Sequence, residues 1–167
     1  MGFDYERDLP HQSRAIASIC GIFEESECKE IRGEISHLSN PLYTIKPSSI
    51  KSVQRENELE ERVVKESVFD ICMETGTGKT YTYTKMMYEL YKNFGISKFV
   101  IIVPSVAIRL GASNFLTSLD AKKHFRDEYG CDLQVYALSS QKSKAKKSVF
   151  PSAISEFFYA EDRKSVV

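Results

Sequence analysis

The sequence predicts an α/β domain in which helices flank a parallel β-sheet. The main observation lies between residues 68 and 103, where a short apolar run, a glycine-rich loop, an amphipathic stretch and a second apolar run follow one another. A strand, a helix and a strand in that order form a βαβ unit, with parallel strands and a right-handed crossover. Composition agrees, since 167 residues with 42% hydrophobic and 28% charged side chains suffice for one globular domain with a core.

The chain before residue 68 divides into two predicted regions. Residues 9–25 predict an amphipathic helix that begins after Pro10, because the apolar side chains recur at helical spacing. Residues 26–67 lose this rhythm, and the proline- and serine-rich stretch LSNPLYTIKPSSIKS predicts a loop or a mostly mobile insertion. The charged stretch QRENELEERVVKE that follows is compatible with an exposed helix, in which Glu58 and Arg62 are spaced to pair.

Residues 68–167 carry the alternating elements of the predicted α/β domain. The predicted organisation is therefore an N-terminal helix at 1–25, an insertion or linker at 26–67 and a partial α/β domain at 68–167. Strands are predicted in VFDICM (68–73), KFVIIV (98–103) and DLQVYAL (132–138), the second of them covered on both faces. Helices are predicted at 79–94, from Ser105, at 121–129 and in PSAISEFFYAED, with glycine stops at 95 and 130. The predicted core face of the first of these helices is Met86, Met87, Leu90 and Tyr91.

Charge and hydropathy limit the classes of protein. The formal net charge is zero, so the chain as a whole is no polycation, and any nucleic-acid surface must be local. The N-terminus has no apolar signal core and no run approaches the length of a membrane span, which predicts a cytoplasmic protein without a membrane partner. A lysine-rich loop is either simply solvated or a DNA contact, and its members are Lys142, Lys144, Lys146 and Lys147.

The stretch METGTGKT, residues 73–80, predicts a phosphate-binding loop. It matches the pattern GxxxxGK[ST] except that Met73 replaces the first glycine, at a position where the backbone curve has not yet begun. Gly76 and Gly78 permit a tight curve whose amides, with those of Thr75 and Thr77, point at a phosphate. Lys79 is placed to reach the β- and γ-phosphates, and the Thr80 hydroxyl to ligate Mg²⁺. The pattern therefore predicts ATP and Mg²⁺ as cofactors, with Lys79 and Thr80 as catalytic residues and Thr80 as the metal ligand; the alternative is a glycine-rich turn with a chance lysine.

The longer stretch METGTGKTYTYTKMMYELYKNFGISKFVIIVPSVAIR resembles the motor domain of type III restriction endonuclease Res subunits, within helicase superfamily 2. The resemblance covers roughly residues 5–25 and 68–160 and leaves the segment 26–67 outside it. It implies an incomplete first motor lobe with the RecA-like fold of P-loop NTPases. It also implies an ATP-dependent type III endonuclease that acts on double-stranded DNA with a DNA methyltransferase (modification) subunit as partner.

The resemblance assigns roles to three further residues. LPHQSRAI is similar to the glutamine motif of such motors, which implies that Gln12 recognises adenine; the alternative is a solvated residue in the first turn of a helix. PSVAIR is similar to the motif that contacts the phosphates of a tracking strand, which implies that Ser105 and Arg109 bind nucleic acid. Ser105 is equally suited to cap a helix, and Arg109 to be an ordinary surface arginine.

Hydrolysis requires a second acidic motif, which this superfamily writes as four apolar residues followed by Asp-Glu. FFYAED has the acidic pair in the reverse order and apolar residues at helical spacing, so we expect the motif beyond residue 167. Two alternatives to the endonuclease motor therefore stay open. One is a truncated nucleotide-binding module without catalytic activity, and the other is a different superfamily 2 DNA helicase or repair motor.

Overall fold

The computed structural model describes residues 5–29, 39–63, 68–138, 152–159 and 165–166. The chain divides into two compact units. The helical unit comprises Glu6–Gly33 and Pro41–Ile96, so it joins the predicted N-terminal helix to most of the segment predicted to be an insertion. The sheet unit comprises Met1–Tyr5, Glu34–Asn40 and Ser97–Val167. None of the helices in the described ranges is both long and apolar enough to cross a membrane.

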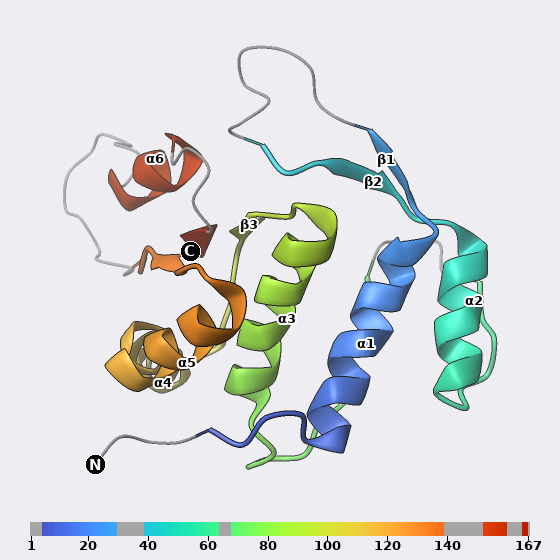
Figure 1. The fold of residues 1–167 in the computed structure, drawn as a ribbon, viewed down its shortest axis with the longest axis horizontal. Coiled ribbons are helices and arrows are strands. Elements are labelled where there is room, and N and C mark those ends of the chain that lie inside the picture. The colour runs from blue at the N-terminus through green and yellow to red at the C-terminus, as the bar shows by residue number, and fades with distance from the viewer. Residues whose placement is uncertain (1–4, 30–38, 64–67, 139–151, 160–164, 167) are drawn as a thin grey trace. The chain divides into compact units, whose positions relative to one another are not determined.

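The helical unit is built around three helices. Its elements in chain order are α1 (Pro10–Glu24), β1 (Glu27–Lys29), β2 (Leu42–Thr44), α2 (Pro47–Glu56) and α3 (Lys79–Phe94). Helix α1 lies between α2 and α3 and contacts both, while β1 and β2 form an antiparallel pair (Figure 1). The predicted helices at 9–25 and 79–94 are confirmed. Gly95 ends α3 in the left-handed conformation, as predicted.

The core of the helical unit lies between α1 and α3. The buried apolar side chains of α1 include Ala15, Ile16 and Ile22. On α3, Met87 and Leu90 of the predicted core face are buried, whereas Met86 and Tyr91 are only half-buried. A second cluster closes the end of α3, where the ring centroids of Phe23 and Phe94 lie 5.5 Å apart and Tyr43 meets both rings edge-on.

Part of the segment predicted to be a loop is regular. Both β2 and the first turns of α2 lie inside LSNPLYTIKPSSIKS. Pro47 does not prevent the helix, because it occupies the first helical position, where a backbone N–H would have no partner within the helix. Helix α2 packs on α1, where a Cβ on Gly21 would lie 3.1 Å from Val53 Cγ2.

The predicted exposed helix in QRENELEERVVKE is wrong for its described residues, 54–63, of which only the first three belong to a helix. Helix α2 ends at Glu56, and Glu58 has φ = 57°, which breaks any continuation of the helix. The expected pair of Glu58 with Arg62 is also wrong, since the Arg62 guanidinium bonds Glu60 at 2.8 Å instead. Glu60 and Arg62 are two positions apart, and such residues lie on the same face of an extended backbone but not of a helix.

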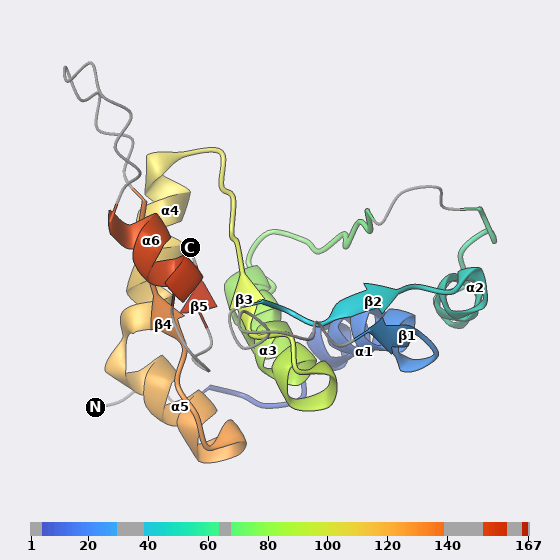
Figure 2. The ribbon, with the colours of Figure 1, turned by 90° about the horizontal axis from the view of Figure 1, so that it is seen from above.

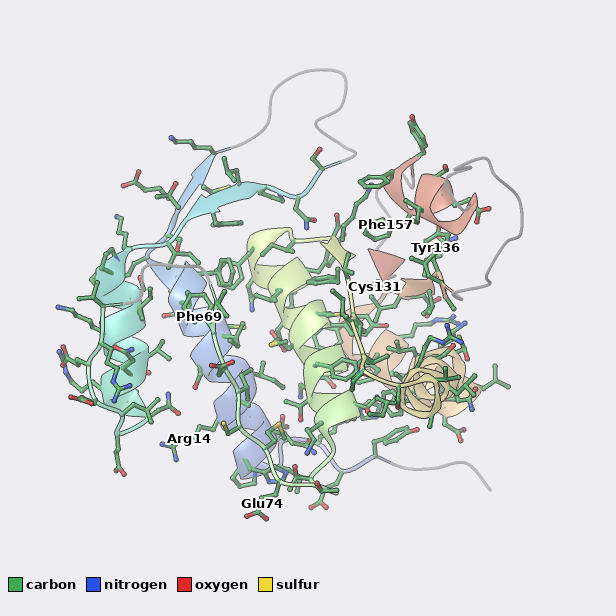
Figure 3. All side chains as sticks on the ribbon, turned by 180° about the vertical axis from the view of Figure 1, so that it is seen from behind. Arg14, Phe69, Glu74, Cys131, Tyr136 and Phe157 are labelled. Atoms are coloured by element: carbon green, nitrogen blue, oxygen red, sulfur yellow. The ribbon has the colours of Figure 1, made fainter. Side chains whose placement is uncertain are left out.

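The strand predicted at 68–73 is absent. These residues form no ladder with any described strand, and Val68 and Ile71 are exposed. They lead into the first turn of α3 (Figure 2), and the labels of Phe69 and Glu74 mark the course of the segment in Figure 3. A strand requires a partner for its backbone as well as a β-branched composition, and the composition alone does not supply that partner.

The sheet unit holds a short parallel sheet. Its elements are β3 (Lys98–Phe99), α4 (Val106–Thr117), α5 (Leu119–Tyr129), β4 (Gln134–Val135), α6 (Ser152–Tyr159) and β5 (Ser165–Val166). Strand β5 lies between β3 and β4 and is parallel to both. Figure 1 shows β4 and β5 between α6 and the pair α4–α5. The predicted helices from Ser105 and at 121–129, with the stop at Gly130, are confirmed.

The two strands predicted in this unit are much shorter than expected. Strands β3 and β4 each pair with the two residues of β5, Ser165 and Val166, and each strand is therefore only two residues long. The expectation that 98–103 is covered on both faces is wrong, because Val100 is 62% and Ile102 is 89% exposed. The structure is therefore a mixed α/β arrangement with short strands.

A half-buried thiol on α1 gives a first testable prediction. Burial, followed by the charges of Glu89 and Glu24, raises the pKa of the Cys20 thiol from 9.0 to about 11. Because the thiolate is the reactive form, we expect iodoacetamide at pH 8 to alkylate Cys20 roughly 100-fold more slowly than an unshifted thiol. The exposed Cys72 supplies the comparison in the same digest, read by peptide mass spectrometry. Equal rates at the two thiols would contradict the raised pKa of Cys20.

The same shift links Cys20 to stability. The folded pKa lies above the unfolded value, so the contribution of Cys20 is fully present below pH 9 and is lost as the pH rises toward 11. Over that window the unfolded chain ionises its thiol while the folded chain keeps its proton.

Candidate phosphate-binding site

The loop before α3 has the backbone of an anion-binding turn. Residues 75–77 form a turn and a bend, and Gly78 is the N-cap of α3 with φ = 81° and ψ = 35°. Gly76 has φ = 86°, so both predicted glycines adopt the left-handed conformation that side chains disfavour. Met73 is not among the described non-glycine residues with positive φ, which are Asp8 and Glu58. The position that departs from the usual motif therefore has no conformational need for glycine.

Gly78 is also required by a close approach. A Cβ at this position would lie 2.5 Å from Gln12 Nε2, a separation that real Cβ atoms essentially never show. At Gly76, in contrast, nothing lies within 4 Å of the added carbon. The two glycines of the loop thus have different reasons for being glycine.

The N-terminus of α3 lies at this loop. The first bond of the helix runs from the Thr82 N–H to the Gly78 carbonyl at 2.9 Å, so the N–H groups of Lys79 and Thr80 precede the first helical bond. The aligned peptide dipoles make this end electropositive. The Thr77 hydroxyl donates to the Glu74 carbonyl at 2.7 Å and closes the turn that precedes it.

Lys79 lies over the loop. Its Nζ donates to the carbonyl oxygens of Met73 at 2.9 Å and Glu74 at 2.6 Å, and the side chain is otherwise exposed. An ammonium group carries three N–H bonds, so among the described residues one donor remains for an anion. Thr80, the second residue of α3, is half-buried, and its carbonyl accepts from the Thr84 hydroxyl at 2.7 Å. A cation, a helix N-terminus and a curved backbone together can hold a phosphate group.

The first turn of α1 contacts the phosphate-binding loop through the Thr77 carbonyl. Gln12 is 5% exposed, and its Nε2 donates to the Thr77 carbonyl at 3.0 Å. Its Oε1 is buried and has no partner among the described residues. His11 Nε2 lies 3.0 Å from the same carbonyl oxygen. Gln12 was predicted from the sequence and His11 was not, although the two are adjacent in the stretch PHQ.

An ion pair anchors the entrance to α1. Lys85 is buried on α3, and its Nζ contacts Asp8 Oδ1 at 3.0 Å. Asp8 has φ = 60°, a conformation that aspartate tolerates better than most residues. The segment that leads into His11 and Gln12 is thus fixed to the same helix that follows the loop.

The residues predicted to bind nucleic acid lie in the sheet unit. Ser105 caps α4, where its Oγ accepts from the Ile108 N–H at 3.3 Å. Arg109 donates from one guanidinium nitrogen to the Leu138 carbonyl at 2.7 Å. Both side chains therefore have a structural role, and their contact with nucleic acid stays a prediction. The four lysines of the basic loop at 142–147, and the acidic pair of FFYAED, lie outside the described residues.

Comparisons with known proteins identify the family. The family model described as "Type III restriction enzyme, res subunit" matches residues 9–165. The Res subunit of the type III restriction-modification enzyme EcoPI from Escherichia phage P1 is 40% identical over 172 residues, which cover 96% of this chain and 18% of the relative. The EcoP15I Res subunit from Escherichia coli is 39% identical over 173 residues, with coverage of 96% and 18%. The StyLTI Res subunit from Salmonella typhimurium is 35% identical over 161 residues, with coverage of 95% and 14%.

The matched region includes nearly all of the helical unit, with its loop, and nearly all of the sheet unit. The chain spans less than a fifth of the length of these three relatives. The family stated from the sequence is confirmed, but its extent is corrected, because the match also includes residues 26–67, which were expected to lie outside it. The chain belongs to the family of type III restriction enzyme Res subunits.

Proposed function

We propose that this chain is the ATP-binding part of the motor domain of an ATP-dependent type III restriction endonuclease that acts on double-stranded DNA. The observation that carries the proposal is the loop at residues 75–80, where a left-handed turn, the N-terminus of α3 and the Lys79 ammonium converge. Such a combination binds the phosphates of a nucleotide. Family membership supports the motor function, and the loop supports the ligand.

The residues fit ATP and Mg²⁺ in the following way. The amides of Thr75, Gly76, Thr77 and Gly78 would surround the β-phosphate, and the free N–H of Lys79 Nζ would reach the β- and γ-phosphates. The Thr80 hydroxyl would ligate Mg²⁺, which when bound neutralises the charge that develops on the transferred phosphoryl group. Lys79 would stabilise the same charge, and for this reason we assign both residues a catalytic role.

Gln12 fits a role in adenine recognition. A carboxamide has two N–H bonds, of which one is used by the Thr77 carbonyl. The second N–H and the buried, unpartnered Oε1 form the donor and acceptor pair that matches N7 and the N6 amino group of adenine. Adenine binding at Gln12 would satisfy the orphan oxygen.

The finer fold and the partners follow from the family. We propose that the chain forms the incomplete first motor lobe of a RecA-like P-loop NTPase, in which the parallel strands β3, β5 and β4 belong to the sheet. Ser105 and Arg109 would contact DNA phosphates, and a DNA methyltransferase (modification) subunit would be the partner that supplies the recognition site. The site of action would be the cytoplasm, where such DNA is encountered.

Nucleotide binding by the 167-residue chain tests the proposal. We expect saturable binding of a fluorescent ATP analogue that requires Mg²⁺ and is competed by unlabelled ATP. We expect almost no hydrolysis with DNA present, because no acidic motif of the required form was found in the sequence. A chain extended to the length of its relatives should hydrolyse ATP when double-stranded DNA is added. Absence of any Mg²⁺-dependent binding would contradict the proposed function, and turnover by the extended chain without DNA stimulation would favour another motor.

A further inference from the structure

Resting on the nucleotide site proposed above, we propose that His11 is a positioning residue of the phosphate-binding loop. Its Nε2–H donates to the Thr77 carbonyl and thereby fixes the peptide group between Thr77 and Gly78 in the orientation that presents the Gly78 N–H to a phosphate. The role differs from that of Gln12, which is buried and has an additional acceptor for a base.

Two donors on α1 converge on one acceptor. His11 Nε2 and Gln12 Nε2 both lie 3.0 Å from the Thr77 oxygen, and a carbonyl oxygen has two lone pairs, one for each donor. Because the partner is a carbonyl, the His11 Nε2 must carry the proton. The neutral Nε2–H tautomer and the imidazolium both meet this condition, so the contact persists when the ring is protonated.

Fixing a carbonyl fixes the amide bonded to it. The peptide group is planar and trans, so the Gly78 N–H points in the direction opposite to the Thr77 C=O. The carbonyl points at α1, and the N–H therefore points away from α1, on the side where an anion would be held. Rotation of this peptide is governed by ψ of Thr77 and φ of Gly78, and a glycine resists such a rotation least. The bonds from α1 supply the restraint that the glycine lacks.

His11 is held in place by its neighbours while its ring is exposed. Ala15 and Ile16 of the next turn are buried, and the Asp8–Lys85 pair fixes the residues before α1. The His11 side chain itself is exposed, so it adds little to the burial that stabilises the unit. A change at His11 should accordingly act on the loop and leave the fold intact, which separates this residue from Gln12.

The test compares two replacements of His11 in the 167-residue chain. His11→Gln keeps a side-chain N–H donor, whereas His11→Phe keeps a ring and removes the donor. The probes are Mg²⁺·ATP and Mg²⁺·tripolyphosphate, which share the phosphates but not the adenosine. We expect His11→Phe to weaken both by the same factor, about three- to tenfold, the loss of one hydrogen bond. His11→Gln should stay within about twofold of the wild type, and neither replacement should change the thermal unfolding midpoint.

A second measurement needs no nucleotide. The Gly78 amide resonance of the ligand-free chain should broaden in His11→Phe, because its peptide then samples a second orientation, and should stay sharp in His11→Gln. Unchanged affinity for both probes and a sharp Gly78 resonance in His11→Phe would overturn the inference. A loss restricted to ATP would also overturn it, since it would place His11 at the nucleoside. Failure of the wild type to bind ATP would count against the proposed function alone, because the amide measurement still decides the role of His11.

Discussion

Replacement of Gly78 by alanine is expected to lower the free energy of unfolding by about 2–5 kcal/mol and to abolish nucleotide binding. The left-handed φ of 81° costs a side chain roughly 1–2 kcal/mol. The added Cβ would also lie 2.5 Å from Gln12 Nε2, so Gln12 must leave the Thr77 carbonyl, and a buried donor without a partner costs about 1–3 kcal/mol more. Urea denaturation followed by circular dichroism gives the stability, and the fluorescent ATP analogue gives the binding.

Gly76→Ala is the matched control for this replacement. Its φ of 86° imposes the same backbone cost, but the new carbon meets nothing within 4 Å. We expect a loss of only about 1–2 kcal/mol for Gly76→Ala. Equal losses at the two glycines would show that the contact with Gln12 contributes nothing to stability.

Replacement of Lys79 by alanine is expected to weaken Mg²⁺·ATP binding roughly 10- to 100-fold, the usual effect of losing a charge-assisted hydrogen bond. The side chain is exposed and its two bonds within the loop run to carbonyl oxygens, so the unfolding midpoint should change little. Isothermal titration calorimetry of the chain with Mg²⁺·ATP measures the affinity directly.

Lys51→Ala provides the control for charge. Lys51 is an exposed lysine on α2 in the same helical unit, and its loss changes the net charge equally. We expect wild-type affinity for Lys51→Ala. If both replacements weaken binding by the same factor, the effect comes from overall charge, and the loop is not the phosphate site.

Local signals in the sequence predicted the parts of the site that depend on the chain nearby. The glycines, Lys79 and the beginning of α3 follow from one short pattern, and the structure gives them the expected left-handed turn and helix start. The contact between α1 and Thr77 joins residues that lie 65 and 66 positions apart. No periodicity or motif encodes such a separation, and a side chain such as His11 could be found only from the folded chain.

The strands were harder to predict than the helices for a physical reason. Helices α1, α3 and α5 satisfy their backbone bonds internally, so spacing and caps such as Gly95 and Gly130 suffice to locate them. A strand depends on backbone hydrogen bonds to another segment. The apolar runs at 68–73 and 98–103 have the composition of strands, but the first pairs with no described strand and the second pairs only at Lys98 and Phe99. The β2–α2 region was missed because prolines that usually mark loops also begin helices, as Pro47 does.

The near-contact of Gly78 with Gln12 has an evolutionary consequence. A residue smaller than glutamine at position 12 would open room for a Cβ at 78, while any Cβ at 78 excludes glutamine from its present rotamer. The side chains at positions 12 and 78 therefore compete for the same space, and a substitution at one position requires a compensating substitution at the other. Among homologous chains, the identities of these two residues should covary.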